Sequence, residues 1–209
     1  PMRAYFDHNA TTPLEPAVLE AMLPYLRGEY GNASSIHTPG QHARAAVERA
    51  RAQVAALIGA EPEEVIFTSG GTEADNMAIL GAAAALAPGG HHAITSSIEH
   101  HAVLHSFRAL ESQSPPWSVT YLPVANDGLV SPAALREALR PGTALVSIMH
   151  ANNEVGSIQP IAELTASAHE AGALFHTDAV QSAGKIPVDV RALGVDLLAL
   201  SAHKFYGPK

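Results

Sequence analysis

The amino-acid sequence predicts an α/β sandwich, in which helices cover both faces of a mostly parallel sheet. Two observations favour this fold class. Short apolar runs alternate with helical patterns along most of the chain, as in consecutive βαβ units. The run at residues 144–149 is apolar at almost every position, which is typical of a strand that is covered on both faces.

The expected elements follow in chain order. Residues 1–35 are rich in Asn, Thr, Ser, Pro and Gly, so we expect an irregular N-terminal arm followed by one domain over residues 36–209. Residues 41–58 place apolar side chains three or four positions apart, which predicts an amphipathic helix that ends at Gly59. Strands are expected at 65–68, 93–97, 119–122, 144–149, 174–177 and 196–200, and further helices at about 73–86, 101–112, 132–140 and 161–171.

Composition excludes several classes of protein. Charged residues make up 15% of the 209 residues, against about 25% in typical domains, so we expect much of the surface to be covered, as in an oligomer. The net charge of -8 without a basic cluster argues against nucleic acid as a partner. No apolar stretch is long enough for a bilayer and no secretion signal is visible, so we expect a soluble, cytoplasmic protein with no membrane partner. The absence of cysteine excludes a disulfide or a thiol nucleophile from these residues.

The first candidate site follows the expected strand at 65–68. Gly70 and Gly71 let the backbone approach a ligand closely, and the N-terminus of the next helix presents free N–H groups to an anion. Thr72 is expected to cap this helix together with Asp75. The segment is therefore a candidate phosphate cradle, and a plain turn that needs glycine is the alternative.

Four more polar groups follow other expected strands, where ligands of open α/β sheets collect. Asp178 could pair with a cation such as a protonated pyridine nitrogen, or could simply cap a helix. His100 offers a stacking surface or an acid–base group, and Asn153 offers an amide donor or a turn residue. Lys204 is placed to hold an aldehyde cofactor as a Schiff base, or is merely solvated. Because His100 and His101 are adjacent and point apart, we expect no metal site there.

The motifs at these strand ends resemble those of the pyridoxal-phosphate-dependent cysteine desulfurases, in the class V aminotransferase superfamily of fold type I. The resemblance extends over nearly the whole chain, and its asparagine and lysine motifs are closer to the NifS/IscS-type branch. The matching segments are residues 7–13 (DHNATTP), 31–37 (GNASSIH), 68–73 (TSGGTE), 99–103 (EHHAV), 152–156 (NNEVG), 176–181 (HTDAVQ) and 201–204 (SAHK).

The resemblance implies a role for each candidate residue in binding pyridoxal 5'-phosphate. The catalytic residues would be Lys204, which forms the Schiff base, and His100, which stacks on the ring and transfers protons. Asp178 would hold the ring nitrogen, and no residue would bind a metal. The remaining cofactor-binding residues would be Asn153 and Gln181 near the ring hydroxyl, and Gly71, Thr72, Ser201 and His203 at the phosphate.

The resemblance also implies a fold and an activity. Residues 36–209 would form the large domain of a fold type I PLP-transferase, a three-layer α/β/α domain that is incomplete before a C-terminal small domain. The enzyme would be a homodimeric sulfurtransferase. It would convert L-cysteine to L-alanine and transfer the sulfur to an enzyme cysteine as a persulfide. The persulfide would then supply sulfur to a scaffold protein for iron–sulfur clusters or to a thiolation pathway.

The chain departs from this family in one respect. The family supplies the nucleophilic cysteine and a substrate-binding arginine from residues after the lysine, whereas this sequence has no cysteine and ends at Lys209. We therefore expect an N-terminal portion, arising as a fragment, a split gene product or a truncated chain, that is inactive alone. The alternatives are another class V enzyme, such as an aminotransferase or a selenocysteine lyase, and a non-catalytic half that pairs with a complementary chain.

Overall fold

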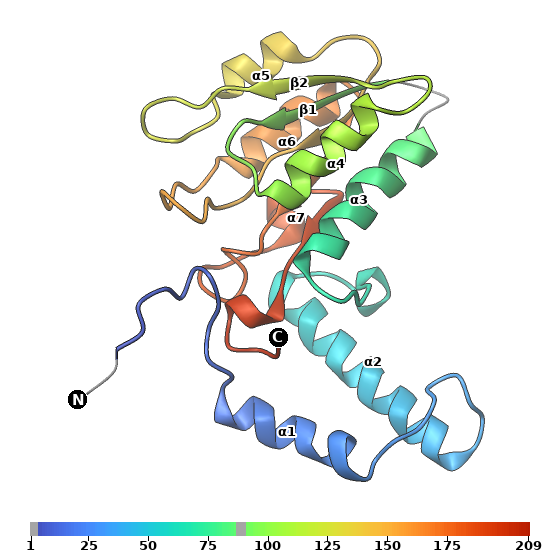
Figure 1. The fold of residues 1–209 in the computed structure, drawn as a ribbon. Coiled ribbons are helices and arrows are strands. Elements are labelled where there is room, and N and C mark those ends of the chain that lie inside the picture. Colours follow the sequence, from blue (N-terminus) through green and yellow to red (C-terminus); the bar gives the residue numbers. More distant parts are fainter. Residues whose placement is uncertain (1–3, 87–90) are drawn as a thin grey trace.

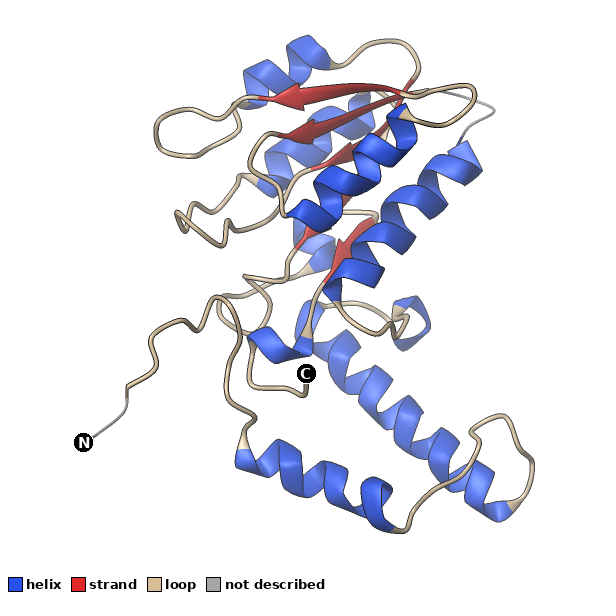
Figure 2. Cartoon of the chain, in the orientation of Figure 1, coloured by secondary structure: helices blue, strands red, loops and turns tan. Residues whose placement is uncertain are grey.

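The computed structural model describes residues 4–86 and 91–209 and confirms the predicted α/β class. Its centre is a five-stranded sheet in the order β2-β1-β3-β4-β5, and every neighbouring pair of strands is parallel (Figures 1 and 2). The strands are β1 (His92–Ser96), β2 (Ser118–Leu122), β3 (Thr143–Ser147), β4 (Leu174–Asp178) and β5 (Leu197–Ala199). Five of the six predicted strands are thus present, with bounds that differ by one or two residues.

Helices cover both faces of this sheet, as Figure 1 shows. Alternate residues of a strand point to opposite faces, so Ala93 and Leu145 enter one apolar core while their neighbours Ile94 and Val146 enter the other. The first core is closed by α3 (Gly71–Leu86) and α4 (His101–Glu111), and the second by α5 (Pro132–Ala138) and α6 (Ile161–Glu170). These two cores fix the carboxyl ends of the strands as a rigid edge.

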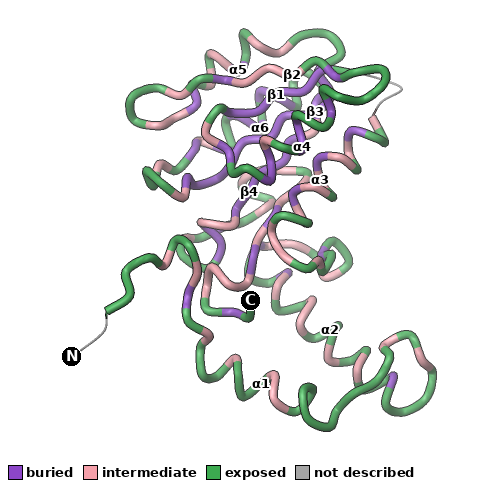
Figure 3. The backbone as a smooth tube through the Cα atoms, viewed as in Figure 1, coloured by how far each residue is buried: buried purple, intermediate pink, exposed green. Residues whose placement is uncertain are grey.

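Two helices project away from the sheet and are exposed over most of their length (Figures 1 and 3). They are α1 (Pro16–Arg27) and α2 (Thr38–Ile58). The helix predicted at 41–58 is confirmed, and it ends at Gly59 in the left-handed conformation, with φ 70°. The irregular arm predicted for residues 1–35 is wrong at α1, where a proline at the first helical position and an apolar stripe start a helix. Residues 1–3 of that arm lie outside the described residues.

The strand predicted at 65–68 is not formed. These residues are extended, but they join no ladder within the described parts of the chain. Ile66 and Phe67 are 71% and 49% exposed, and the guanidinium of Arg51 donates to the Val65 carbonyl and lies over the Phe67 ring. Apolar, β-branched residues predict a strand only where a neighbouring strand can pair with it, and the described sheet offers none here.

Three short helical segments of the described residues were not predicted, because they are too short to show helical periodicity. They are η1 (Pro62–Glu64), α7 (Val190–Leu193) and η2 (Ala202–Lys204). The last of these carries Lys204 directly behind β5, so it matters for the site. Among the helices of the described residues, none combines the length and the apolar character needed to cross a membrane.

Candidate active site

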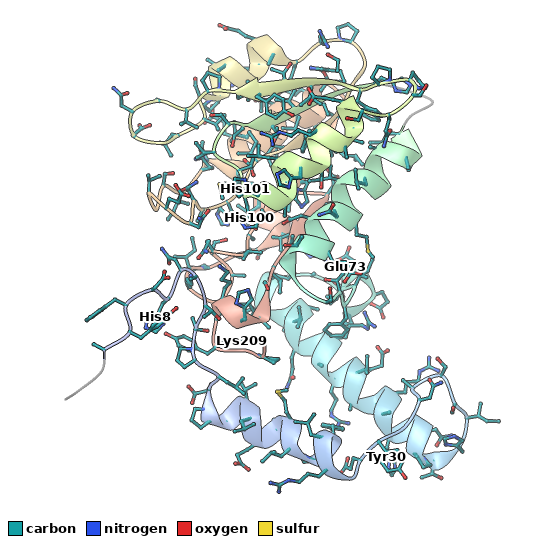
Figure 4. The ribbon with its side chains drawn as sticks, viewed as in Figure 1. His8, Tyr30, Glu73, His100, His101 and Lys209 are labelled. Atoms are coloured by element: carbon teal, nitrogen blue, oxygen red, sulfur yellow. The ribbon has the colours of Figure 1, made fainter. Side chains whose placement is uncertain are left out.

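The carboxyl ends of the strands open into a cavity of about 470 Å³. Figure 4 shows His100 at the start of α4, above the loop that ends at Lys209 in this view. All the residues proposed to bind the cofactor line this cavity, and their individual roles remain predictions. They are Gly71, Thr72, His100, Asn153, Asp178, Gln181, Ser201, His203 and Lys204. Sequence reasoning assigned no cavity role to Asp7, Asn9 or Asp75, which line it too.

Lys204 reaches the cavity from η2, and its ammonium group donates a 2.6 Å hydrogen bond to the backbone carbonyl of Asn9. Partial burial lowers the pKa of Lys204, while the carboxylates of Asp178 and Asp7 act in the opposite direction. A lysine amine attacks a carbonyl group only in its neutral form, so a lowered pKa favours this reaction. The environment of Lys204 therefore suits a nucleophilic amine.

The loop around Lys204 is held by the N-terminal arm. The backbone N–H and the hydroxyl of Thr12 each donate to the His203 carbonyl at 2.9 Å, and the Tyr206 N–H donates to the Thr12 hydroxyl at 2.7 Å. Tyr206 has a φ of 68°, a strained conformation for a residue other than glycine. The Glu15 N–H donates to the Tyr206 carbonyl at 3.0 Å, so the arm supports this strained residue on both sides. The motif at residues 7–13 was the only sequence signal for this contact.

Asp178 ends β4 and is only 5% exposed. Its Oδ1 accepts a hydrogen bond of 2.9 Å from the Val180 N–H. Burial raises the pKa of Asp178, whereas the Val180 N–H, His100 and Lys204 stabilise the charged form. The carboxyl group thus lies in a poorly solvated place where a cation is the natural partner.

His100 caps the N-terminus of α4. Its Nδ1 accepts a hydrogen bond of 3.1 Å from the Ala102 N–H, so the neutral imidazole carries its proton on Nε2. This contact fixes the ring against the helix while the side chain lines the cavity. His100 can therefore present a flat face and a defined N–H group to a ligand.

The phosphate end of the candidate site depends on Gly71. A Cβ atom at this position would lie 2.9 Å from Val180 Cγ2 and 3.4 Å from Ser201 Cβ, so only glycine lets α3 begin this close to the loop after β5. Thr72 lies inside α3, so its predicted role as the helix cap is wrong; instead Glu73 accepts from the Ser69 N–H at 2.5 Å. The unpaired N–H groups of the first turn, with Thr72, Ser201 and His203, form a donor set suited to an anion.

A chain of hydrogen bonds connects Asn9, Asn153 and Gln181 and orients the amide groups of Asn9 and Gln181. Asn9 donates from Nδ2 to the Asn153 carbonyl at 3.1 Å, and Gln181 donates from Nε2 to the Asn9 carbonyl at 2.9 Å. Lys185 donates to Gln181 Oε1 at 2.8 Å. Because a carbonyl only accepts and an ammonium group only donates, both contacts require the same orientation of the Gln181 amide.

Two further acids are buried near Asp178. Asp75 is 1% exposed, and burial, aided by Asp178 and Glu99, raises its pKa to about 9. The predicted capping role of Asp75 is wrong, because its side chain points into the protein instead of to the helix start. Burial also raises the pKa of Glu99 to about 8, against the Ser96 hydroxyl and the Met149 N–H, which donate to Glu99 Oε1. Beside them, burial lowers the pKa of His176 to about 4.

The residues present fit pyridoxal phosphate. A primary amine, a buried carboxyl group and an anion cradle that a Cβ atom would fill all line one cavity. Lys204 would hold the aldehyde, Asp178 the ring nitrogen, and the start of α3 the phosphate. Within residues 4–86 and 91–209, no group of three or more His, Asp or Glu side chains is arranged to hold a metal ion.

A parallel α/β sandwich with a lysine in a cavity at its carboxyl edge agrees with an enzyme of the class V aminotransferase type. The chain belongs to this family, because the family model described as "Aminotransferase class-V" matches residues 4–209. The curated relatives include the "Cysteine desulfurase IscS" of Dictyoglomus turgidum, 57% identical over 205 residues that cover 98% of this chain and 52% of that protein. The human "Cysteine desulfurase" is 51% identical over 206 residues, 98% of this chain and 45% of that protein. The chain spans about half the length of the curated relatives it matches.

Solved structures show the same relationship. A "NIFS-LIKE PROTEIN" superposes with a TM-score of 0.95 at 42% sequence identity, and the match covers 100% of this chain and 57% of that one. A structure titled "SspA in complex with cysteine" gives a TM-score of 0.94 at 43% identity over 99% of this chain and 59% of that one. The fold is therefore that of NifS-like cysteine desulfurases, which confirms the predicted fold class.

Proposed function

We propose that this chain is the cofactor-binding part of a pyridoxal-phosphate-dependent cysteine desulfurase, which converts L-cysteine to L-alanine and passes the sulfur to an enzyme cysteine. The observation that carries this proposal is that Lys204, Asp178 and His100 line one cavity. The names of the relatives and the cysteine bound to a structural neighbour support the choice of substrate.

Bound pyridoxal phosphate would supply an aldehyde for the amino group of the substrate and a ring that withdraws electrons from its Cα atom. Asp178 keeps a negative charge at the ring nitrogen. The neutral amine of Lys204 would accept and return a proton at Nζ, and His100 would offer the flat face of its imidazole to the ring. Asn153 and Gln181 orient the ring through its hydroxyl group, and Gly71, Thr72, Ser201 and His203 hold the phosphate.

The sulfur-accepting thiol must come from elsewhere, because these 209 residues contain no cysteine. We place this thiol either in further residues of the same protein or in a second chain. On this proposal the 209-residue chain binds the cofactor but forms no persulfide.

The first experiment locates the imine. Protein loaded with pyridoxal phosphate is reduced with borohydride, and the modified lysine is identified by mass spectrometry. We expect the adduct on Lys204, its loss together with the visible absorbance band in Lys204→Ala, and its retention in the neighbouring control Lys185→Ala. An adduct on another lysine, or none, contradicts the proposal and favours a non-catalytic role.

The second experiment follows alanine. Given L-cysteine and a reductant, the 209-residue chain is expected to give no sustained alanine, and a preparation that adds the missing thiol is expected to give it. Sustained turnover by the 209 residues alone contradicts the thiol assignment. A second candidate is a class V aminotransferase, which the matching family model supports and which needs no thiol; a 2-oxo acid product would identify it.

We further propose that the protein is a homodimer in the cytoplasm and that its sulfur acceptor is a scaffold protein for iron–sulfur clusters. Exposed apolar side chains on the projecting helices support an interface there, among them Leu19, Tyr25 and Leu26 on α1 and Leu57 on α2. Sedimentation of wild type against Leu26→Glu tests this point, and we expect the substitution to weaken the dimer. A monomeric wild-type protein contradicts the proposal.

A further inference from the structure

A buried acid and a buried imidazole meet directly behind Asp178. His176 and Asp178 are two positions apart on β4, so they share a face of the sheet, and α3 brings Asp75 over that face. On one side of the His176 ring, Nδ1 lies 2.8 Å from the hydroxyl of Ser147 on β3. On the other side, Nε2 lies 3.6 Å from Asp75 Oδ1.

Neither of the two facing atoms has another partner among the described residues. Asp75 Oδ1 and His176 Nε2 are both fully buried and both lack a hydrogen bond. Without a proton between them, a carboxylate lone pair would face a ring lone pair in a medium of low polarity, and one shared proton removes this repulsion. Asp75 is also among the residues that line the cavity, so the pair lies directly beside the candidate site.

The surrounding charges favour a neutral pair. The ionisable groups that act on Asp75 are Asp178 and Glu99, which are both acids, and with burial they raise the pKa of Asp75 to about 9. Burial lowers the pKa of His176 to about 4, so the single proton belongs on Asp75 near neutral pH. Burial raises the pKa of Asp178 too, but, unlike Asp75, it also has the Val180 N–H, His100 and Lys204, which stabilise its charged form.

We propose that Asp75 is a neutral acid that donates its proton to Nε2 of His176, and that this pair leaves Asp178 as the carboxylate that meets the ring nitrogen. The inference rests on the proposed function, since the ring is that of pyridoxal phosphate. Asp75 and His176 are positioning residues that act through Asp178. In this arrangement His176 carries its own proton on Nδ1 and donates it to the Ser147 hydroxyl.

The first test observes the imidazole directly. Nitrogen NMR of histidine-labelled, cofactor-loaded protein, with His176→Gln to assign the signal, reports its tautomer and charge. We expect His176 to stay neutral with its proton on Nδ1 between about pH 6 and about pH 8, where an ordinary histidine titrates. A cationic ring, a titration in this range or a proton on Nε2 overturns the proposal.

The second test compares two substitutions of Asp75. Asp75→Asn keeps a neutral donor for Nε2. We therefore expect a cofactor dissociation constant within about twofold of wild type, and the same pH profile of the visible absorbance of the bound cofactor. Asp75→Ala leaves Nε2 without a donor, and we expect about tenfold weaker cofactor binding and a changed visible band. If Asp75 were an anion, Asp75→Asn would remove a charge beside the ring and shift the pH profile by about one unit, which overturns the proposal.

The outcomes separate this inference from the proposed function. If wild-type protein forms no imine on Lys204, the proposed function fails, and the same NMR measurement on cofactor-free protein still decides the state of the pair. If the imine forms and Asp75→Asn shifts the pH profile, only the present inference fails. Near-ultraviolet circular dichroism shows whether Asp75→Ala folds; if it does not, Asp75→Asn and the NMR spectrum decide.

Discussion

The ammonium group of Lys204 is bound to the backbone carbonyl of Asn9, 195 positions earlier in the chain, at 2.6 Å. The same carbonyl accepts from Gln181, and the Asn9 side chain donates to the Asn153 carbonyl. One residue of the N-terminal arm thus connects three segments of the candidate site. A backbone carbonyl cannot be removed by substitution, so the arm is tested at Thr12, whose hydroxyl binds the loop around Lys204.

Replacement of Thr12 by valine tests whether the arm positions the lysine loop. Thr12→Val removes the hydroxyl that donates to His203 and accepts from Tyr206. We expect a loss of about 1–3 kcal/mol in the free energy of unfolding and weaker cofactor binding, because two hydrogen bonds are lost and the Tyr206 N–H is left without its partner. Urea unfolding and a cofactor titration measure the two effects.

Thr165→Val is the matched control for Thr12→Val. The Thr165 hydroxyl is buried without a hydrogen-bond partner among the described residues, so its removal is expected to leave stability and cofactor binding unchanged or slightly improved. Equal losses in both variants would show that the arm has no special role.

Replacement of Gly71 by alanine tests the phosphate cradle. The added Cβ would lie 2.9 Å from the stiff Val180 side chain, so the start of α3 must move away from Ser201. We expect cofactor affinity to fall about tenfold. On the same helix, Gly81→Ala meets no atom within 4 Å and is expected to raise stability by up to about 1 kcal/mol without changing affinity. Unchanged affinity in Gly71→Ala would remove this glycine from the site.

Replacement of Gly184 by alanine distinguishes the cost of a positive φ from the cost of a steric clash. Gly184 has a φ of 74°, and a Cβ there would lie 2.8 Å from Phe205, which follows Lys204. Gly142 has a φ of 85° and open space around it, so Gly142→Ala should cost only the backbone strain of about 1–2 kcal/mol. We expect Gly184→Ala to cost about 1–3 kcal/mol more in urea unfolding and to weaken cofactor binding. A loss no larger than that of Gly142→Ala would show that Phe205 moves freely.

Acid sensitivity is expected from His92. Both ring nitrogens of this buried histidine lie within 2.9 Å of threonine hydroxyls, and burial, aided by Arg140, lowers its pKa from 6.5 to about 4. Between these values His92 binds more protons in the unfolded chain than in the folded one, so its contribution to stability falls as the pH falls from 6.5 to 4. The contribution of His92 is at most about 1.4 kcal/mol per pH unit.

Urea unfolding at several pH values measures this dependence. We expect His92→Gln to lose the contribution of His92 to the slope. The slope that remains combines His176, His150 and His203, whose pKa values burial also lowers, with Asp75 and Glu99, whose raised pKa values act in the opposite direction. An unchanged slope in the variant would assign the acid sensitivity to other groups.

The sequence predicted the layers of the fold and the position of the site, but not the contacts that hold the site residues in place. Apolar runs such as residues 144–149 indicate buried strands because both faces of the sheet are covered, and polar residues after those strands fall at one edge by geometry alone. The extended segment at 65–68 was wrongly predicted as a strand, because pairing depends on a neighbour that local composition does not reveal.

The same limit applies within the site. Lys204, Asp178 and His100 could be found because each lies at or after the carboxyl end of a strand. The role of Asn9 could not be predicted, because every residue has a backbone carbonyl and the partner of this one lies 195 positions away. Asp75 was misassigned as a cap because a helix-start pattern does not tell which face of the helix the sheet covers.

The hydrogen bonds between the N-terminal arm and the loop around Lys204 have a consequence for folding. The Thr12 hydroxyl and the His203 carbonyl are 191 positions apart, so this contact closes a very long loop of chain. Contacts of such long range form slowly, because much chain entropy is lost before they stabilise anything. Thr12 therefore cannot complete this contact until His203 is in place, so the sheet can assemble before Lys204 is held in position.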